Sequence, residues 1–337
     1  MKKLTVGMAT HNDFDGVYFT IQSLRLANRD LEDQIEYLVV DNNPDSPHGK
    51  TTEHFCKAAG VRYVPEAGWK STAVRNRVFE NAETPFVLCL DSHVLLGGSA
   101  LGLLLQHFEN DPHTDNLFHG IMLYDPLNKE AGCVTHMNPE WRSGMYGTWG
   151  HEPENKIPYQ PIHGEAFNIP MHGMGLFACR REAWVGFNPL FRGFGGEEGY
   201  IHEKFRQAGG VTMCLPWLKW VHRFDRPNPV AYPLAPEQKV LNYYIGWGEL
   251  GMDTTQITDH FKGENPELDL AALEVESMAW LNKYEADPEK TLHERHNPTE
   301  EPRVWNTTAT MIKNPLELEF NGNRFQLAGF QLKWSPD

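Results

Sequence analysis

The sequence predicts an α/β fold, a doubly wound unit with a mostly parallel central sheet. Short apolar runs alternate with helical patterns over the first third of the chain, which is typical of such a unit. Two of these runs, "EYLVVD" and "FVLCLD", end in aspartate, at Asp41 and Asp91. Because ligands bind these sheets at the carboxyl ends of the strands, the two aspartates are candidate site residues.

The hydrophobic pattern places the N-terminal elements in order. We expect strands at residues 4–9, 35–40, 61–64 and 85–90. We expect helices at residues 17–26, 51–59 and 71–80. Segment 124–165 is rich in Pro, Gly, His and Trp and has little periodicity, so it predicts a lid, an acceptor loop or a packed connector.

Further strands and helices follow. "GLFACRREAW" predicts a strand and the start of a helix, and "VTMCLPW" predicts another strand. Between them, "FRGFGGEEGY" is a glycine-rich loop leading into a helix on which Ile201 and Phe205 share a face. After about Pro229 come two helical patterns and then an alternating run around Asn321-Gly322, a strong turn signal. We therefore expect a C-terminal helical segment and a small antiparallel β unit.

Charge and cysteine usage narrow the classes of function. The net charge of -15 disfavours electrostatic binding to nucleic acid or anionic lipid, because binding to phosphate groups needs Lys and Arg. The five cysteines are widely spaced and odd in number, which indicates reduced thiols in a cytoplasmic protein. The longest mostly apolar stretch, at 94–105, is broken by glycines and is too short to span a bilayer.

Two groups of residues suggest chemistry. Asp91 and His93 follow a strand end, and a carboxylate with an imidazole suits Mn²⁺ or a similar divalent ion. Taken alone, these residues fit better with Asp91 as a helix cap and His93 as a surface residue. Glu197 and Glu198 lead into a helix after two glycines that let the backbone approach a ligand, although a carboxylate also stabilises a helix N-terminus. His222 stands where a strand ends.

Several motifs together resemble a known family. They are, in order, "VGMATHN", "YLVVDNN", "GWKSTAVRNR", "FVLCLDSHVLL", "GLFACRREAW", "GFGGEEGYIHEKFRQAGG" and "VHRF". Their order and spacing resemble GT-A glycosyltransferases, which have a Rossmann-like nucleotide-sugar-binding domain. The Asp-x-His motif and the later His resemble polypeptide N-acetylgalactosaminyltransferases, and the Gly-Gly-Glu-acidic run is similar to beta-1,4-galactosyltransferases. The resemblance covers residues 4–226, so we expect a catalytic domain at 1–230. We expect an extension at 231–337 for acceptor binding or oligomerisation.

The resemblance implies roles for particular residues. The implied metal ligands for Mn²⁺ or Mg²⁺ are Asp91, His93 and His222. The metal would hold the diphosphate of a nucleotide sugar, most simply a UDP-sugar, and act as a Lewis acid. The implied donor-binding residues are Thr10, Asp41, Lys70, Arg75, Asn76, Gly173 and Gly175. Glu198 would be the general base of an inverting transfer, and Glu197 would bind donor or acceptor hydroxyls.

The chain also departs from these families. Phe194 stands where both usually have Trp, and His163, Glu165 and His172 match neither pattern although they lie near the expected site. Nothing after Pro229 resembles the lectin domain of the N-acetylgalactosaminyltransferases, so we do not carry over their specificity for peptide acceptors. One family retains anomeric configuration and the other inverts it. Donor sugar, acceptor and oligomeric state stay open.

Three alternative functions remain. A sugar-phosphate nucleotidyltransferase would need a basic, glycine-rich loop after the first strand, but "ATHNDFDG" has no basic residue. A catalytically inactive sugar- or nucleotide-binding protein is disfavoured by the intact candidate site. Glycosylation of a modified base in DNA is disfavoured by the acidic charge.

Overall fold

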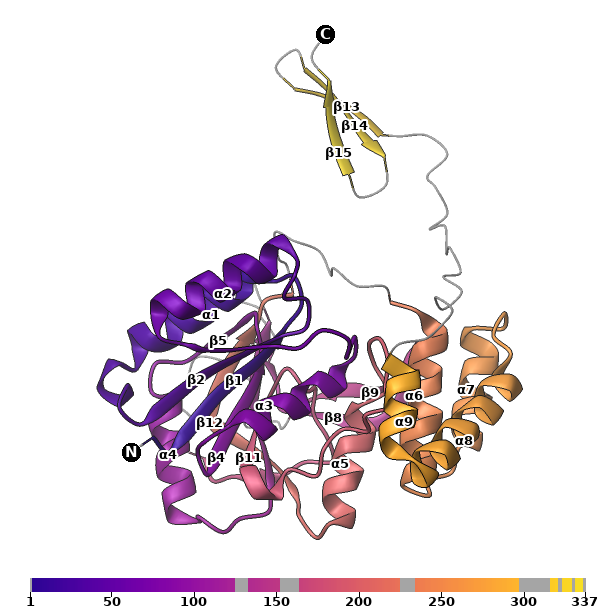
Figure 1. Cartoon of the computed structure of the whole chain (residues 1–337), viewed down its shortest axis with the longest axis horizontal. Coiled ribbons are helices and arrows are strands. Elements are labelled where there is room, and N and C mark those ends of the chain that lie inside the picture. Colours follow the sequence, from indigo (N-terminus) through magenta and orange to yellow (C-terminus); the bar gives the residue numbers. More distant parts are fainter. Residues whose placement is uncertain are drawn as a thin grey trace. The chain divides into compact units, whose positions relative to one another are not determined.

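The computed structural model describes residues 2–124, 133–151, 164–224 and 234–296 in full, and three later strands by their backbone. The chain forms two compact units, Met1–Asn297 and Pro298–Asp337. Figure 1 shows the first unit as a twisted sheet covered by helices.

The central sheet of the first unit has the strand order β10-β12-β6-β11-β4-β1-β2-β3, with β5 on β12 and β7 on β6. The bounds of these strands are β1 (Leu4–Thr10), β2 (Ile35–Asp41), β3 (Arg62–Pro65), β4 (Phe86–Asp91), β5 (Val94–Leu96), β6 (Leu117–Tyr124), β7 (Cys133–Val134), β10 (Phe167–Asn168), β11 (Leu176–Arg180) and β12 (Thr212–His222). Strands β1 to β4 are parallel, as are β6 and β12, whereas β11 runs antiparallel between β4 and β6. The predicted α/β fold is confirmed.

Helices cover both faces of this sheet. Their bounds are α1 (Phe14–Ala27), α2 (Pro47–Ala59), α3 (Asn76–Asn81), α4 (Ala100–Asn110), α5 (Glu198–Gln207), α6 (Pro236–Glu249), α7 (Thr255–Glu264), α8 (Leu270–Ala286) and α9 (Pro288–His296). One core contains side chains of α1, α2 and α4 with Val39 and Leu88 of the sheet. A second core contains side chains of α3, α5 and α6 with Val40 and Val87. Neighbouring strand residues thus point to opposite faces, as the pleat of a strand requires.

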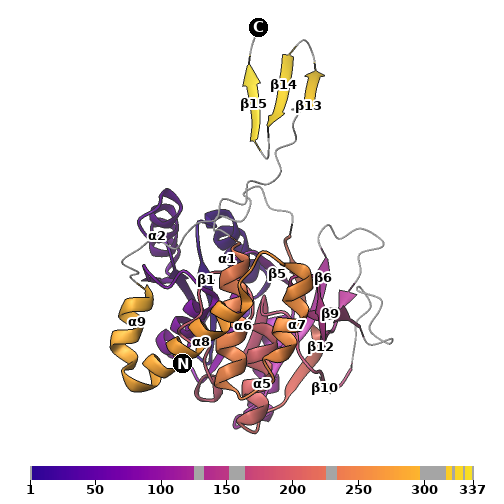
Figure 2. The same cartoon turned by 90° about the vertical axis from the view of Figure 1, so that its right-hand side faces the viewer.

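The helices after residue 234 belong to the first unit. Side chains of α6 and α7, including Tyr243 and Phe261, form a core of their own, and Figure 2 shows α6, α7 and α8 grouped together. The expected boundary at 230 lies among residues outside those described, so the division into a catalytic domain and an extension stays a prediction. In the described residues, no helix is long and apolar enough to cross a membrane, and a cytoplasmic location also stays a prediction.

The second unit contains an antiparallel sheet of β13 (Leu316–Phe320), β14 (Asn323–Ala328) and β15 (Gln331–Ser335). This agrees with the small antiparallel unit expected from the alternating pattern. The expected turn at Asn321-Gly322 lies outside the described residues.

Some elements differ from the sequence-based expectation. The expected helix at 71–80 is a 3-10 turn at Thr72–Arg75 followed by the short α3. Segment 124–165, expected to be irregular, contains the hairpin of β8 (His136–Arg142) and β9 (Met145–Gly150). Most residues of this hairpin are partly buried or exposed, so its sequence lacks the alternation of a strand with one buried face. Its Tyr146 N donates to Tyr243 Oη of α6 at 2.8 Å.

Candidate functional site

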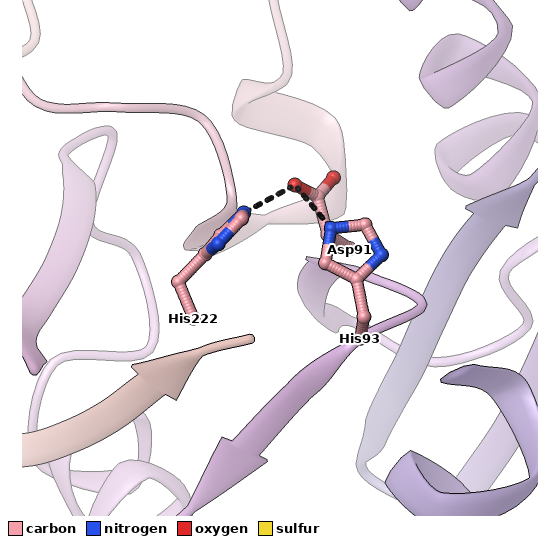
Figure 3. Close-up of side chains that lie close together, drawn as sticks. All are labelled: Asp91, His93 and His222. Atoms are coloured by element: carbon pink, nitrogen blue, oxygen red, sulfur yellow. Dashed lines mark ion pairs between the residues drawn. The ribbon is translucent and has the colours of Figure 1, made fainter. Parts of the chain in front are cut away.

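Strand pairing brings Asp91, His93 and His222 together, although they come from two distant parts of the chain. Asp91 is the last residue of β4 and His222 is the last residue of β12. Strand β5 follows His93 directly and pairs antiparallel with β12, so that Val94 lies opposite His222. The register of this short pairing therefore places both imidazoles beside the Asp91 carboxylate, as Figure 3 shows.

The three side chains have the geometry of an open metal site. Asp91 Oδ2 lies 3.8 Å from His93 Nε2 and 3.6 Å from His222 Nε2. Donors about 2.1–2.3 Å from one ion would be roughly 3–3.5 Å apart, so a small inward movement suffices. Among the described residues, these three form the group of His, Cys, Asp and Glu that could hold an ion. One carboxylate and two imidazoles suit a borderline divalent cation.

Arg75 connects the metal candidates to the acidic pair. Its Nη2 lies 2.5 Å from Asp91 Oδ1, and its Nη1 lies 3.7 Å from Glu197 Oε1. Burial alone would raise the pKa of Asp91, but Arg75 and the two histidines outweigh it and hold that pKa far below its ordinary value. Asp91 is therefore a carboxylate at any working pH, as a metal ligand must be.

Glu197 and Glu198 differ in environment. Glu197 is 2% exposed and precedes α5, whereas Glu198 is half-buried and begins it. Burial and the neighbouring Glu198 raise the pKa of Glu197 to about 8 although Arg75 opposes the rise. Burial also raises the pKa of Glu198, against its own backbone hydrogen bond, Arg75 and Lys239. Adjacent buried carboxyl groups do not ionise together readily, so the more buried Glu197 keeps the proton.

A second group of polar residues lies at the same edge of the sheet. Asp41 ends β2 and pairs in register with Thr10 of β1, while Ala9 pairs with Asp91. Asp41 is almost fully buried and accepts hydrogen bonds from Tyr63 Oη and Asn43 N, both at 2.9 Å. Burial raises its pKa despite these bonds. Thr10 Oγ1 is buried and forms no hydrogen bond with the residues that the structure describes.

Lys70 lies beside this polar group. Its backbone has a positive φ of 41°, and its amide N donates to Asn42 Oδ1 at 3.4 Å. The positive charge of Lys70 lowers the pKa of His11, although burial contributes more to that shift. Lys70 is exposed, so its amine is available to a ligand at this edge of the sheet.

The two expected floor glycines lie against aromatic rings. The carbonyl of Gly175 accepts from Asp91 N at 2.8 Å. A Cβ on Gly175 would come within 3.2 Å of His222 Cδ2, and one on Gly173 within 2.9 Å of the Trp149 ring. A side chain at Gly175 would thus press on His222.

The side-chain amide of Asn76 forms hydrogen bonds within the protein. Its Oδ1 accepts from Trp184 Nε1 and Phe187 N, and its Nδ2 donates to Phe187 O. These contacts give Asn76 a structural role, and its expected contact with the donor is a prediction that they do not support.

The residues left unassigned by the sequence fall in different places. His172 is buried next to His119 and His202, Glu165 is exposed, and His163 lies outside the described residues. The sequence did not identify Asp13, whose carboxylate bonds to His93 Nδ1 at 2.8 Å. Asp13 stands in a polar turn after the first strand, and such a turn does not indicate a partner 80 residues along the chain.

A comparison with known protein families identifies the family of this chain. The pattern of glycosyl transferase family 2 matches residues 5–181. The chain belongs to this family. It is a glycosyltransferase of GT-A fold, and the match ends just after β11 and includes Asp91 and His93.

A solved structure shares the fold of this family 2 chain. It is described as the crystal structure of GalNAc-T7 with UDP, GalNAc and Mn²⁺, and its TM-score to this chain is 0.57 at 17% sequence identity. The alignment covers 90% of this chain and 60% of that chain, so the present protein spans well under the full length of that relative. The expected likeness to N-acetylgalactosaminyltransferases is confirmed at the level of the fold. No curated protein sequence matches significantly.

Proposed function

We propose that this glycosyltransferase moves a sugar from a nucleotide sugar, a UDP-sugar, to a hydroxyl acceptor with the help of a divalent metal ion. The observation that carries the proposal is the convergence of Asp91, His93 and His222 at the carboxyl edge of the sheet. The similar structure of GalNAc-T7 was solved with UDP and Mn²⁺, which supports Mn²⁺, or Mg²⁺ in its place.

Several residues of the chain would bind or position the donor. When bound, the metal would neutralise the diphosphate and stabilise the leaving group. Asp41 would hydrogen-bond the nucleoside, with Thr10 lining the same site and Lys70 providing a cation beside it. Arg75 keeps Asp91 ionised and aligned through its 2.5 Å contact. Gly175 leaves the space beside His222 open, and Gly173 shapes the adjoining floor.

Glu198 is the general base of the proposed transfer. A base must be ionised and within about 2.6–3.2 Å of the acceptor oxygen. Because Glu197 retains its proton, Glu198 is the member of the pair that loses one first. Glu197 would then donate a hydrogen bond to a sugar hydroxyl, and the reaction would invert the anomeric configuration.

The test is a titration of the full chain with Mn²⁺ in the presence of UDP, followed by a panel of UDP-sugars. We expect Mn²⁺ binding in wild type, its loss in His93→Ala and His222→Ala, and metal-dependent release of UDP with one or more donors. Mn²⁺ binding without turnover on any sugar would favour the inactive binding protein. Equal Mn²⁺ affinity in wild type and both alanine variants would refute the metal assignment.

A further inference from the structure

The N-terminal end of α1 touches both segments that carry the candidate histidines, the turn between β4 and β5 and the end of β12. Asp13 precedes α1, and its Oδ2 lies 2.8 Å from His93 Nδ1. The same oxygen accepts from Ser92 Oγ at 2.7 Å, while Oδ1 accepts from Gly16 N at 3.2 Å. One carboxylate therefore caps a helix and holds the segment that follows Asp91.

The bond to Asp13 selects one tautomer of His93. An ionised carboxylate only accepts hydrogen bonds, so His93 Nδ1 carries the proton. In the neutral ring the lone pair is then on Nε2, which is the nitrogen that faces Asp91 Oδ2. Carboxylates that bond the far nitrogen of a histidine ligand fix its orientation and raise its basicity in metal sites.

Packing in the first two turns of α1 reinforces this arrangement. A Cβ on Gly16 would lie 2.4 Å from Asp13 Oδ2 and 2.7 Å from the Ser92 carbonyl oxygen. One turn later, Oγ1 of Thr20 lies 2.8 Å from the carbonyl oxygen of Ser92 and 2.9 Å from that of Val94, and its one proton can be donated to either. Glycine thus allows α1 to close directly over the loop that carries His93.

The same turn reaches the second histidine through Arg223. Arg223 follows His222, and its Nη2 donates to Asp15 Oδ2 at 3.0 Å. Its backbone N donates to the His93 carbonyl at 3.2 Å. Asp13 and Asp15 therefore hold the two sides of the candidate metal site from a single helical turn.

We propose that the first turn of α1 is a positioning element for metal binding, in which Asp13 sets the tautomer and orientation of His93 and Asp15 holds the segment after His222. This rests on the proposed metal site. Asp13 touches neither the metal nor substrate in this proposal and acts only through His93.

The test is Asp13→Asn in the full chain, with the free Mn²⁺ concentration measured by electron paramagnetic resonance in the presence of UDP. The asparagine oxygen can still cap α1, but its amide then faces His93 and draws the proton to Nε2. We expect Mn²⁺ to bind roughly 10–100-fold more weakly. In the metal-free protein, long-range ¹H–¹⁵N spectra should show the proton of His93 on Nδ1 in wild type and on Nε2 in the variant.

The matched control is Asp269→Asn. Asp269 caps α8 by accepting from Ala272 N at 3.0 Å, so it tests the loss of a capping charge away from the site. We expect it to bind Mn²⁺ like wild type. Gly16→Ala provides a second probe, because alanine favours the helix yet pushes against the Asp13 carboxylate, and it should also weaken Mn²⁺ binding.

Two outcomes overturn the inference in distinguishable ways. If His93→Ala loses Mn²⁺ but Asp13→Asn binds it like wild type with an unchanged His93 tautomer, the positioning role is wrong and the metal site stands. If His93→Ala binds Mn²⁺ like wild type, the metal site fails and the positioning role fails with it.

Discussion

Two groups of three residues, both rich in histidine, lie in the first unit and differ in what surrounds them. In the first, His93 and His222 flank Asp91, and all three side chains are 15–18% exposed. In the second, His119, His172 and His202 are completely buried, and within the described residues no carboxylate forms an ion pair with them. A histidine is therefore a candidate metal ligand when a carboxylate lies beside it and solvent can reach it. The presence of a histidine alone does not indicate a metal site.

The second group supports the backbone of the site. His202 Nε2 lies 2.9 Å from His119 Nε2 and accepts from His172 N at 3.2 Å. The Nδ1 of His202 bonds to the carbonyl of Glu198, and that of His119 bonds to the carbonyl of Leu176. These bonds fix the first turn of α5 against β6 and β11, so the buried group orients the helix that presents the candidate base.

The largest expected effect separates the two groups. His222→Ala should abolish detectable Mn²⁺ binding and slow sugar transfer by roughly a thousandfold, because a Lewis acid supplies several kcal/mol of stabilisation to the transition state. Its melting temperature without metal should stay close to that of wild type. His172→Gln should do the reverse, lowering stability with Mn²⁺ affinity retained. Transfer unaffected by His222→Ala would remove the first group from the mechanism.

Glu198→Gln is expected to have the next largest effect. It keeps the shape of the side chain and removes its basicity, so transfer should slow at least about a hundredfold while donor binding is normal. The wild-type rate should fall as pH drops through the raised pKa of Glu198, and the variant should lack this decline. The measurement is single-turnover transfer against pH, with the anomeric configuration of the product determined by NMR. A product that retains the donor's configuration would exclude the role of Glu198 as base.

Asp41→Ala tests the polar residues at the end of β2, away from both groups. Loss of a hydrogen bond to a charged group costs about 1.5–3 kcal/mol, so the KM for the donor should rise at least tenfold while kcat changes less. Mn²⁺ affinity without nucleotide should be unaffected. Steady-state kinetics over a range of donor concentrations provide the measurement, and an unchanged KM would take Asp41 out of the site.

The smallest effect concerns the pH dependence of stability. Burial lowers the pKa of His172 to about 4 and that of His202 to about 3, whereas an unfolded chain has an imidazole pKa near 6.5. The unfolded state therefore takes up these protons first, so stability is fully present above about pH 6.5 and decreases as pH falls towards 4. Each histidine should contribute a loss of about 1.4 kcal/mol at about pH 5.5.

Urea unfolding of wild type and His202→Gln at pH 7.5 and 5.5 measures this contribution. The variant should lose about 1 kcal/mol less than wild type between the two pH values, although it is less stable at both. His113→Gln, which removes an exposed histidine, provides the control for loss of an imidazole at the surface. Identical pH dependence in His202→Gln would show that the buried group does not control acid stability.

The features that could be predicted from the sequence are those that depend on a local pattern of residues. Asp41 and Asp91 stand at strand ends, as expected, because an apolar run followed by a polar residue marks the carboxyl end of a buried strand. The fold class followed from the same alternation. The three metal candidates came from the resemblance to a family, and the structure brings their side chains together.

Contacts over long sequence separations could not be predicted. Asp13 and His93 are 80 residues apart, and nothing in "HNDFDG" marks that contact. Asn76 had the character of a donor ligand near a helix start, yet its amide bonds to Trp184 and Phe187, more than 100 residues away. The short β5, which aligns His93 with His222, has too few residues for a period to be visible.

The pairing of β5 with β12 has a consequence for the order in which the protein is made. Asp15 and Arg223 are 208 residues apart, and His222 is the last residue of its strand. A nascent chain can therefore present β1, α1 and β4 on the ribosome while the proposed metal site still lacks His222. The second imidazole arrives only when β12 has been synthesised and inserted beside β6, so ion binding would report completion of the sheet during translation.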